Sequence, residues 1–421
     1  MIVTLLDAVL LTTYFLLLFL SLFWLLVLLS PEKNDIKKKL TRHPLFSVIV
    51  PAYNEEESIH KTLVSLCNVA YPQEKMEIIV VNDGSTDNTK NIVEEFIREH
   101  PTRNIMLINQ ENKGKGKAMN KGLEKAAGEF FACLDADSFV APNALQVMLP
   151  LFEDDIKIAA VCPLLKVKKP SNVLQKVQWF EYIINMFYRF LNAKLHCIHV
   201  TPGPFSVYRT DVIQEMGGYD EETITEDLEI AIRLQKHHYR IVQTFDTIVE
   251  TESPTTWKTL FRQRVRWYKG SVDNTIRYKK LLFNKQYGDF GMLRMPTIIA
   301  SGVIAIILTS ALVQSMIKKS VQFFLILKDI NFDVITLFKN YTFEFNFLNL
   351  PFFKMTIAFT VILLSFVMMY LAFKVVHEKI TRYGRTWLSL VTYLFIYSLF
   401  LTTVWLYIAY MFIKKKKNFW F

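Results

Sequence analysis

The sequence predicts an α/β fold in which a Rossmann-like domain is joined to transmembrane and interfacial α-helices. Apolar residues form 52% of the 421 residues. They concentrate near the two ends of the chain, whereas the middle has the composition of a soluble protein. In that middle, short apolar segments alternate with amphipathic helical segments, which is typical of a parallel sheet covered on both faces. Together the observations predict a domain anchored in a membrane.

Four apolar segments are long enough to cross a bilayer. The first, Ala8–Leu29, carries no charge and lacks the basic start and cleavage site of a signal peptide. Residues 295–316, 355–373 and 387–413 contain no Asp, Glu, Lys or Arg. The segment 321–339 is also apolar but carries charges inside it, so it is an outside loop helix, a re-entrant piece or a poor span.

Basic residues beside the apolar runs predict the topology. The net charge is +10, and lysines 37–39 and 414–417 flank predicted spans. Such lysines usually meet lipid phosphates on the cytosolic side, and no nucleic-acid-binding module is readable. We therefore expect membrane lipids and not nucleic acid as partners. The N-terminus would lie outside, and the next domain would be cytosolic in a multi-pass protein of the plasma membrane.

The number of crossings is where the topology rules conflict. Four crossings, which the sequence favours, would place 414–417 outside, against the positive-inside rule. A fifth crossing through 321–339 would restore that rule but would bury charges. The expected parts are a transmembrane helix with a basic juxtamembrane segment (1–43), a cytosolic domain with interfacial helices (44–290), and a C-terminal region with about three spans (291–421).

The predicted sheet has acidic motifs where its strands end. Strands are expected at 46–50, 77–81, 105–108 and 130–134, and amphipathic helices at 57–68 and 88–100. Ligands of such sheets bind at the carboxyl ends of the strands. The aromatic and basic segment 171–195 is either a helix at the membrane surface or an ordinary core helix. None of the four cysteines is in a CxxC pair, so reduced thiols are expected instead of zinc ligands or disulfides.

Three carboxylates are candidates for chemistry. Asp83 follows the second strand, where it would accept hydrogen bonds from a base or a ribose, or simply form an Asp-Gly turn. Asp135 and Asp137 follow the fourth strand and point into one crevice, which favours a bound Mg²⁺ or Mn²⁺ over a surface turn. Such an ion would bridge a diphosphate.

Each of two further motifs can be interpreted either as functional or as an ordinary structural feature. Thr225 is an expected N-cap that places Asp227 in the first helical turn, where an acid either complements the helix dipole or acts as a general base. The segment 113–118, KGKGKA, would hold phosphates or form a solvated basic loop, and it is neither a P-loop nor a dinucleotide fingerprint.

The last motif runs from residue 263 to residue 267. Arg266 would clamp a diphosphate, Trp267 would stack on a sugar and Gln263 would supply hydrogen bonds. The alternative is an interfacial basic helix with a tryptophan anchor.

Taken together, these motifs resemble the processive membrane glycosyltransferases of family two, namely the hyaluronan, chitin, cellulose and poly-N-acetylglucosamine synthases. The resemblance spans 46–270 and rests on motifs in the family's order: Pro51-Ala52-Tyr53-Asn54-Glu55, Asp83, Asp135-Ala136-Asp137, Gly203-Pro204, Thr225-Glu226-Asp227 and Gln263 through Trp267. Each motif is weak alone, but the whole set in this order is specific. The resemblance implies a GT-A fold and an inverting reaction on a nucleotide sugar, usually UDP-linked.

The resemblance also implies roles for single residues. Tyr53 and Glu55 would line the nucleotide pocket, Asp83 would contact uracil, and Lys115 or Lys117 would help to hold the nucleotide.

The remaining implied roles concern the metal, the base and the acceptor. Asp137 would bind the metal with Asp135 beside it, and Asp227 would be the general base. Arg266 would lie at the diphosphate. Four residues would lie on the acceptor side: Gly203, Pro204, Gln263 and Trp267.

The substrate is less defined by the resemblance. The sequence 263–267 looks most like the poly-N-acetylglucosamine group, in which Ala and Gln follow the tryptophan, whereas Tyr268 and Lys269 stand here. The expected reaction is transfer from a UDP-sugar, with UDP-N-acetylglucosamine favoured, to a β-linked polysaccharide that is translocated across the membrane. The alternatives are transfer of one sugar to a membrane lipid and, less favoured, a non-catalytic scaffold that binds a nucleotide sugar.

Overall fold

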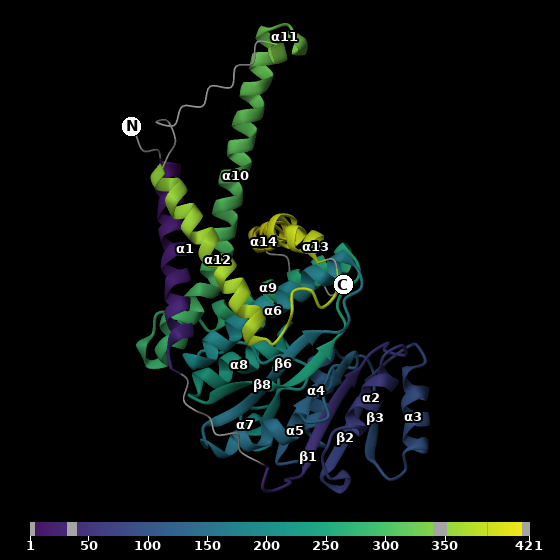
Figure 1. Cartoon of the computed structure of the whole chain (residues 1–421). Coiled ribbons are helices and arrows are strands. Elements are labelled where there is room, and N and C mark those ends of the chain that lie inside the picture. The colour runs from purple at the N-terminus through teal and green to yellow at the C-terminus, as the bar shows by residue number, and fades with distance from the viewer. Residues whose placement is uncertain (1–4, 32–39, 340–351, 385, 415–421) are drawn as a thin grey trace.

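An eight-stranded sheet forms the centre of the protein, as the computed structural model shows (Figure 1). The structure describes residues 5–31, 40–339, 352–384 and 386–414. The strand order is β3-β2-β1-β4-β7-β6-β8-β5. The strands are β1 (Phe46–Ala52), β2 (Met76–Asp83), β3 (Asn104–Gln110), β4 (Phe130–Cys133), β5 (Ser138–Val140), β6 (Ile158–Val167), β7 (Val207–Arg209) and β8 (Arg240–Thr251).

The sheet is parallel in its first half and mixed in its second. β1 pairs in parallel with both β2 and β4, and β2 pairs in parallel with β3. These are the four strands that the sequence predicts, and their positions are confirmed within a few residues. The parallel arrangement expected for these four strands is confirmed. The second half adds antiparallel pairs, because β7 runs antiparallel to β4 and β6, and β5 runs antiparallel to β8.

Helices cover both faces of the sheet because neighbouring residues of a buried strand point to opposite sides. Val48 and Val50 of β1 pack in one cluster with α2 (Ile59–Cys67), α3 (Thr89–Glu99) and α5 (Ala144–Met148). Ile49 between them packs in another cluster with α4 (Lys115–Leu123), α7 (Thr210–Glu215) and α8 (Glu226–Lys236). The edge of the sheet at which the parallel strands have their carboxyl ends therefore lies between two layers of helices.

Two long helices connect the sheet to the apolar part of the chain. These are α6 (Val173–Lys194) and α9 (Trp257–Arg277). α6 packs on β6 on one side and on apolar helices on the other, so Trp179 and Phe180 cluster with Trp24 and Phe373. The predicted segment 171–195 therefore forms a helix that is buried between the sheet and the apolar helices. It is buried like the core helix of one alternative, and it packs on the apolar helices that the other alternative would place in the membrane.

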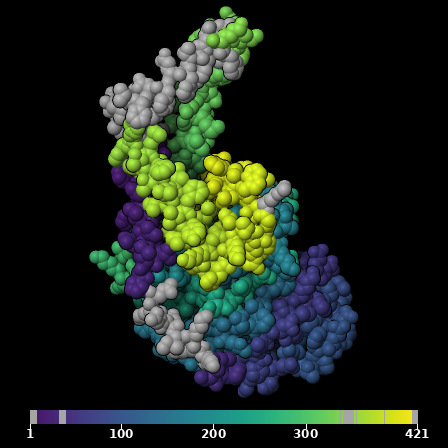
Figure 2. Space-filling model, in the orientation of Figure 1, coloured from purple at the N-terminus to yellow at the C-terminus, as the bar shows by residue number. Residues whose placement is uncertain are grey.

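Within the described residues, four helices are long and apolar enough to cross a membrane: Ala8–Leu29, Phe290–Asp329, Met355–Val375 and Trp387–Ile413. They contain α1 (Leu5–Leu29), α10 (Met295–Asp329), α12 (Phe352–Val375), α13 (Trp387–Val391) and α14 (Ser398–Ile413). In Figure 1, α1, α10 and α12 extend away from the sheet, whereas α13 and α14 lie beside α6 and α9. Figure 2 shows the yellow C-terminal helices seated on this side of the domain.

The ambiguous segment 321–339 does not form a separate span. Its first nine residues continue α10, and α11 (Val334–Lys339) follows a short turn. A helix of 35 residues is about 50 Å long, well beyond the roughly 30 Å of a hydrocarbon core. The charged end of α10 can therefore lie outside the core without a fifth crossing. Lysines 37–39 and 415–417 lie outside the described residues, so the expected side of each terminus stays a prediction.

Short helical turns complete the described elements: η1 (Gln73–Lys75), η2 (Leu149–Glu153), η3 (Lys279–Leu281), η4 (Lys285–Tyr287), η5 (Phe290–Arg294) and η7 (Thr392–Tyr397). All four cysteines are free thiols, as expected, and three of them are buried.

Candidate active site

Acidic side chains gather where the central parallel strands end. Glu55 follows β1, Asp83 is the last residue of β2, and Asp135 and Asp137 follow β4. Because β2, β1 and β4 are parallel neighbours, their carboxyl ends share one edge of the sheet. The register therefore brings residues that are up to about eighty positions apart into one site.

Three of these carboxylates repel one another. Burial, together with the charges of Asp135 and Glu55, raises the pKa of Asp137 to about 7, although the Ser138 hydroxyl donates a hydrogen bond of 3.0 Å that lowers it. Burial likewise raises the pKa of Glu55, with Asp135 contributing, although the Ser58 hydroxyl donates to Glu55 at 2.6 Å. A cation between the carboxylates would relieve this repulsion.

Lys115 supplies one positive charge to this group. Its ammonium lies 2.7 Å from Asp135 Oδ1 and 3.5 Å from Glu226 Oε1. Burial lowers the pKa of Lys115, but the two carboxylates outweigh it and raise the pKa above its ordinary value. Of the two lysines that the sequence nominates, Lys115 is thus the one at the acids, whereas Lys117 is exposed and makes no ion pair within the described part of the chain.

Asp227 belongs to the same electrostatic group. Burial, together with the charge of the neighbouring Glu226, raises its pKa to about 6, and the charges of Lys115 and Arg266 oppose this shift. Lys115 links the two groups of acids, because it contacts Asp135 after β4 and Glu226, the residue before Asp227 in α8. Thr225 stands at the N-cap position as expected, but its side chain caps no helix N–H and instead accepts a hydrogen bond of 3.1 Å from Asn274.

Asp83 has a structural task in addition to any contact with a ligand. The carboxylate is 4% exposed and accepts hydrogen bonds from the Gln110 side chain and from the backbone N–H groups of Lys113 and Gly114, at 2.7–2.9 Å. Gly84 permits this approach: its φ is +73°, and a Cβ there would lie 2.6 Å from the backbone nitrogen of Asn112. Asp83 therefore fixes the loop that leads into Lys115.

The Gly203-Pro204 loop lies against the acids. A side chain at Gly203 would begin 3.5 Å from Asp135 Oδ2 and 3.7 Å from Lys115 Nζ. The backbone N–H of Phe205 donates to the carbonyl of Cys133 at the end of β4, at 2.6 Å. On the other side, the Thr201 hydroxyl donates to the Asp227 carbonyl at 2.9 Å. The loop thus bridges the acids of β4 and the first turn of α8.

The motif at residues 263–267 on α9 contains one buried arginine, Arg264, and one exposed arginine, Arg266. Arg266 is exposed, and its charge acts on both Lys115 and Asp227. Arg264 is fully buried, and its guanidinium donates to both carboxylate oxygens of Glu181 on α6. It also donates to Gln263 at 2.5 Å, and it lies 4.2 Å above the ring of Trp267.

Sequence reasoning missed the pair of Arg264 and Glu181 and the position of Glu226. A signal for the pair was available, since Glu181 is an acid inside an aromatic helix, and such an acid needs a buried partner. Tyr53, which the sequence placed in the nucleotide pocket, is 47% exposed in this structure.

The structure fits a metal that is held partly by its substrate. Among the described residues no group of three or more His, Cys, Asp or Glu side chains is arranged to hold an ion. Asp135 and Asp137 are the two candidate oxygen ligands, and Asp135 Oδ1 is buried with the Lys115 ammonium 2.7 Å away. Mg²⁺ and similar ions are commonly bound through one or two carboxylates plus substrate phosphates, so two protein ligands suffice.

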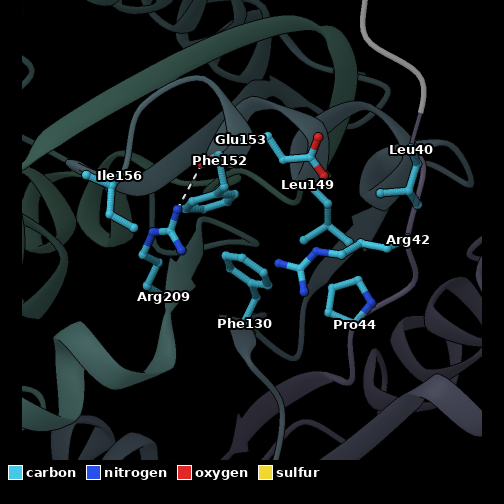
Figure 3. Close-up of a pocket in the computed structure, with 9 residues that line it drawn as sticks. All are labelled: Leu40, Arg42, Pro44, Phe130, Leu149, Phe152, Glu153, Ile156 and Arg209. Atoms are coloured by element: carbon cyan, nitrogen blue, oxygen red, sulfur yellow. Dashed lines mark hydrogen bonds between the residues drawn. The ribbon is translucent and has the colours of Figure 1, made fainter.

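A separate cavity of about 290 Å³ lies at the opposite end of the strands (Figure 3). Phe130, the first residue of β4, lines it together with Arg42, Phe152 and Arg209. The Arg209 guanidinium is already used, because it donates to the carbonyls of Ile158 and Phe152 at 2.8 Å. The acids follow the last residue of β4, so this cavity is not part of the candidate site.

Known proteins resemble this chain in sequence and in fold. A poly-beta-1,6-N-acetyl-D-glucosamine synthase of Staphylococcus epidermidis is 32% identical over 244 residues, covering 56% of this chain and 58% of that protein. The protein of the same name from Staphylococcus aureus (strain COL) is 30% identical over 270 residues, covering 62% of this chain and 64% of the relative. The chain thus spans less than two thirds of the length of these relatives.

The fold also has a solved counterpart. A mannosyltransferase from Pyrobaculum calidifontis, in complex with GDP-Man and Mn²⁺, matches with a TM-score of 0.57 at 21% identity, covering 76% of this chain and 90% of that one. The expected GT-A-like α/β fold is confirmed. The family model described as glycosyl transferase family 2 matches residues 47–217, the stretch that carries Glu55, Asp83, Asp135 and Asp137. Residues 47–217 are thus similar to glycosyl transferase family 2.

Proposed function

We propose that this chain is an inverting glycosyltransferase that transfers N-acetylglucosamine from its UDP-sugar to a growing β-linked polysaccharide. The observation that carries the proposal is the convergence of Asp135 and Asp137 with Asp227 around Lys115. The relatives named as poly-beta-1,6-N-acetyl-D-glucosamine synthases support the choice of sugar and of a polymeric product.

Asp227 would act as the general base that takes the proton from the attacking acceptor hydroxyl. A pKa of about 6 leaves most of the carboxylate ionised at neutral pH and makes it a stronger base than an ordinary aspartate. The hydroxyl then attacks the anomeric carbon as the bond to the diphosphate breaks on the opposite face. A single displacement of this kind inverts the anomeric centre.

The leaving diphosphate carries the growing negative charge. Arg266, which is exposed towards the site, and Lys115 would hold it by charge-assisted hydrogen bonds. Asp137, with Asp135 beside it, would hold the Mg²⁺ or Mn²⁺. The ion, when bound, supplies further positive charge to the diphosphate. On binding of the donor, Lys115 would exchange part of its pairing with Asp135 for a phosphate oxygen.

The two ends of the substrate pair would be recognised by different elements. Tyr53, Glu55 and Asp83 follow β1 and β2 and would contact the nucleotide. The acceptor side would be formed by the loop between α6 and β7 and by α9: Gly203, Pro204, Gln263 and Trp267. Trp267 is partly buried, so its ring can orient a sugar without moving.

We place this reaction on the cytosolic face of the plasma membrane. The four apolar helices, which are long enough to cross it, would anchor the domain and assist export of the product. The domain of residues 44–290 would meet UDP-sugars in the cytosol, with helices of 1–43 and 291–421 on the membrane side. The side of the membrane follows from the positive-inside rule alone.

The test uses the full chain purified in detergent, with Mg²⁺ or Mn²⁺ and a panel of UDP-sugars, and measures UDP release and product length. We expect UDP-N-acetylglucosamine to give the highest rate and a ladder of products. Asp227→Asn should abolish turnover yet retain UDP binding. Asp155→Asn, which alters a surface ion pair with Arg240, is the matched control and should leave the rate unchanged.

Two results would contradict the proposal. Full turnover by Asp227→Asn would remove this residue from the base role. A single glycolipid product instead of a ladder would replace the polymer by a lipid acceptor, while leaving the glycosyl transfer itself intact.

A further inference from the structure

Three basic side chains from different elements form one cluster, and the charge of Asp227 acts on one of them, Arg189. Arg189 projects from α6, His199 lies in the loop between α6 and β7, and Arg294 ends η5. A guanidinium N–H of Arg294 donates to His199 Nε2 at 2.7 Å, so the imidazole accepts through this nitrogen. The charge of Arg189 acts on both His199 and Arg294, which places the three groups in one electrostatic cluster.

The cluster has donors that nothing in the described chain satisfies. Arg189 Nη1 and Arg294 Nε are buried and have no hydrogen-bond partner among the described residues. Arg189 forms neither a hydrogen bond nor an ion pair within that part of the chain. An unsatisfied buried donor costs about 1–3 kcal/mol, and more when the group is charged. Such an arrangement is unfavourable unless an anion joins it.

The charge of the cluster is not balanced by a close acid. The pKa of His199 is held well below its ordinary value by burial and by the guanidinium groups of Arg294 and Arg189, so the ring is neutral. Two positive charges remain. Asp227 acts on Arg189 from a distance, but it forms no ion pair with it, and its Oδ1 accepts instead from the backbone N–H of Leu228 at 2.9 Å.

The position of the cluster identifies the side from which an anion would come. Arg294 lies at the start of the candidate span Phe290–Asp329. Phe290 and Met295 on either side of it are buried against Leu228, the residue after Asp227. In Figure 1, α10 rises from this point away from the sheet. The first turn of such a span lies at the depth of lipid headgroups.

We propose that Arg189, His199 and Arg294 form a phosphate site that binds the headgroup phosphate of an anionic membrane lipid near the helical turn that carries Asp227, the proposed general base. All three residues are partly exposed, so the site can be reached. Two guanidinium forks can each donate bidentately to phosphate oxygens, which provides the partners that Arg189 Nη1 and Arg294 Nε lack. The bound lipid would hold the bilayer surface against the acceptor side of the site.

The site differs from the cations that the proposed reaction uses. Lys115 and Arg266 belong to α4 and α9 and act on the acids at the carboxyl edge. Arg189 and Arg294 come from α6 and η5 and contact none of those acids directly. Lipid binding can therefore be measured without any sugar donor, and its outcome does not depend on the proposed glycosyl transfer.

The experiment measures lipid retention by the full chain, purified and delipidated in detergent, using native mass spectrometry. The probes are phosphatidylglycerol and diacylglycerol with the same acyl chains, which differ in the phosphate headgroup. We expect wild-type protein to bind phosphatidylglycerol at least tenfold more tightly than diacylglycerol. The double variant Arg189→Gln with Arg294→Gln should lose that preference, whereas Arg98→Gln, an exposed arginine on α3, should keep it.

Two outcomes would overturn the proposal. Equal binding of the two lipids by the wild-type protein would exclude phosphate recognition, and this comparison decides even if the double variant does not fold. Unchanged phosphatidylglycerol binding by a folded double variant would exclude these arginines. In a third arm, inorganic phosphate should displace the lipid only at millimolar concentration. If phosphate binds while the lipid does not, the site serves a soluble anion and the lipid assignment is wrong.

Discussion

Replacing Glu181 by Gln isolates the contribution of one buried ion pair between α6 and α9. Arg264 and Glu181 have side chains that are 0% and 8% exposed, and two N–H groups of the guanidinium donate to the carboxylate. Removing one partner of a buried pair leaves the other charge without compensation, at a cost of about 3–5 kcal/mol. At about 2–4 °C per kcal/mol for domains of about 150–250 residues, the melting temperature should fall by about 6–20 °C.

The chain contains a matched control for this substitution. Arg42 and Glu129 form the same two-pronged contact, but their side chains are 57% and 42% exposed. An exposed pair contributes about 0–1 kcal/mol, so Glu129→Gln should lower the melting temperature by less than about 4 °C. Both variants are measured by thermal unfolding in the same detergent. Equal shifts in the two variants would refute the assignment of a large stabilising role to burial of the pair.

Three further predictions concern the acids and the loop beside them. The maximal rate should fall about tenfold per pH unit below pH 6, because Asp227, whose pKa is about 6, must be ionised to act as base; a flat pH–rate profile from 5 to 7 would contradict this. Asp137→Asn should raise the Mn²⁺ concentration needed for half-maximal rate by at least tenfold, measured by metal titration; an unchanged titration would place the ion elsewhere. Gly203→Ala should leave the melting temperature unchanged within about 1 °C, since the added Cβ would lie 3.5 Å from Asp135 Oδ2 and 3.7 Å from Lys115 Nζ. The same substitution should raise the KM for the acceptor, and an unaltered KM would remove this loop from the acceptor side.

The parallel half of the fold was predictable because its signals are local. β1, β2 and β4 are continuous apolar runs, and each is followed by an acid, so sequence alone placed those acids at one edge. The antiparallel strands β5 and β7 have only three residues each, too few for a periodic pattern to be read. Their pairing depends on tertiary contacts that the chain makes over long separations.

The sequence motifs nominate the acids of the candidate site, but they do not predict which hydrogen bonds and ion pairs these acids form. Motif order nominated Asp135, Asp137 and Asp227. In the structure Lys115 contacts Asp135 and Glu226, whereas the sequence alone allowed a solvated loop for this lysine. The three hydrogen bonds that Asp83 accepts depend on the tight turn at Gly84, which no periodicity reveals. Long-range partners such as these are fixed by packing and not by local preference.

The hydrogen bond between Arg264 and Tyr397 ties the C-terminal apolar helix to the arginine motif of α9. The Tyr397 hydroxyl accepts from Arg264 Nε at 3.1 Å, and α14 packs along α9. A shortened chain that stopped before Trp387 to gain solubility would lose this acceptor and would expose the underside of α9 to water. Efforts to obtain a soluble fragment that contains the sheet should therefore retain the last helix, because α9 and the C-terminal apolar segment share this hydrogen bond.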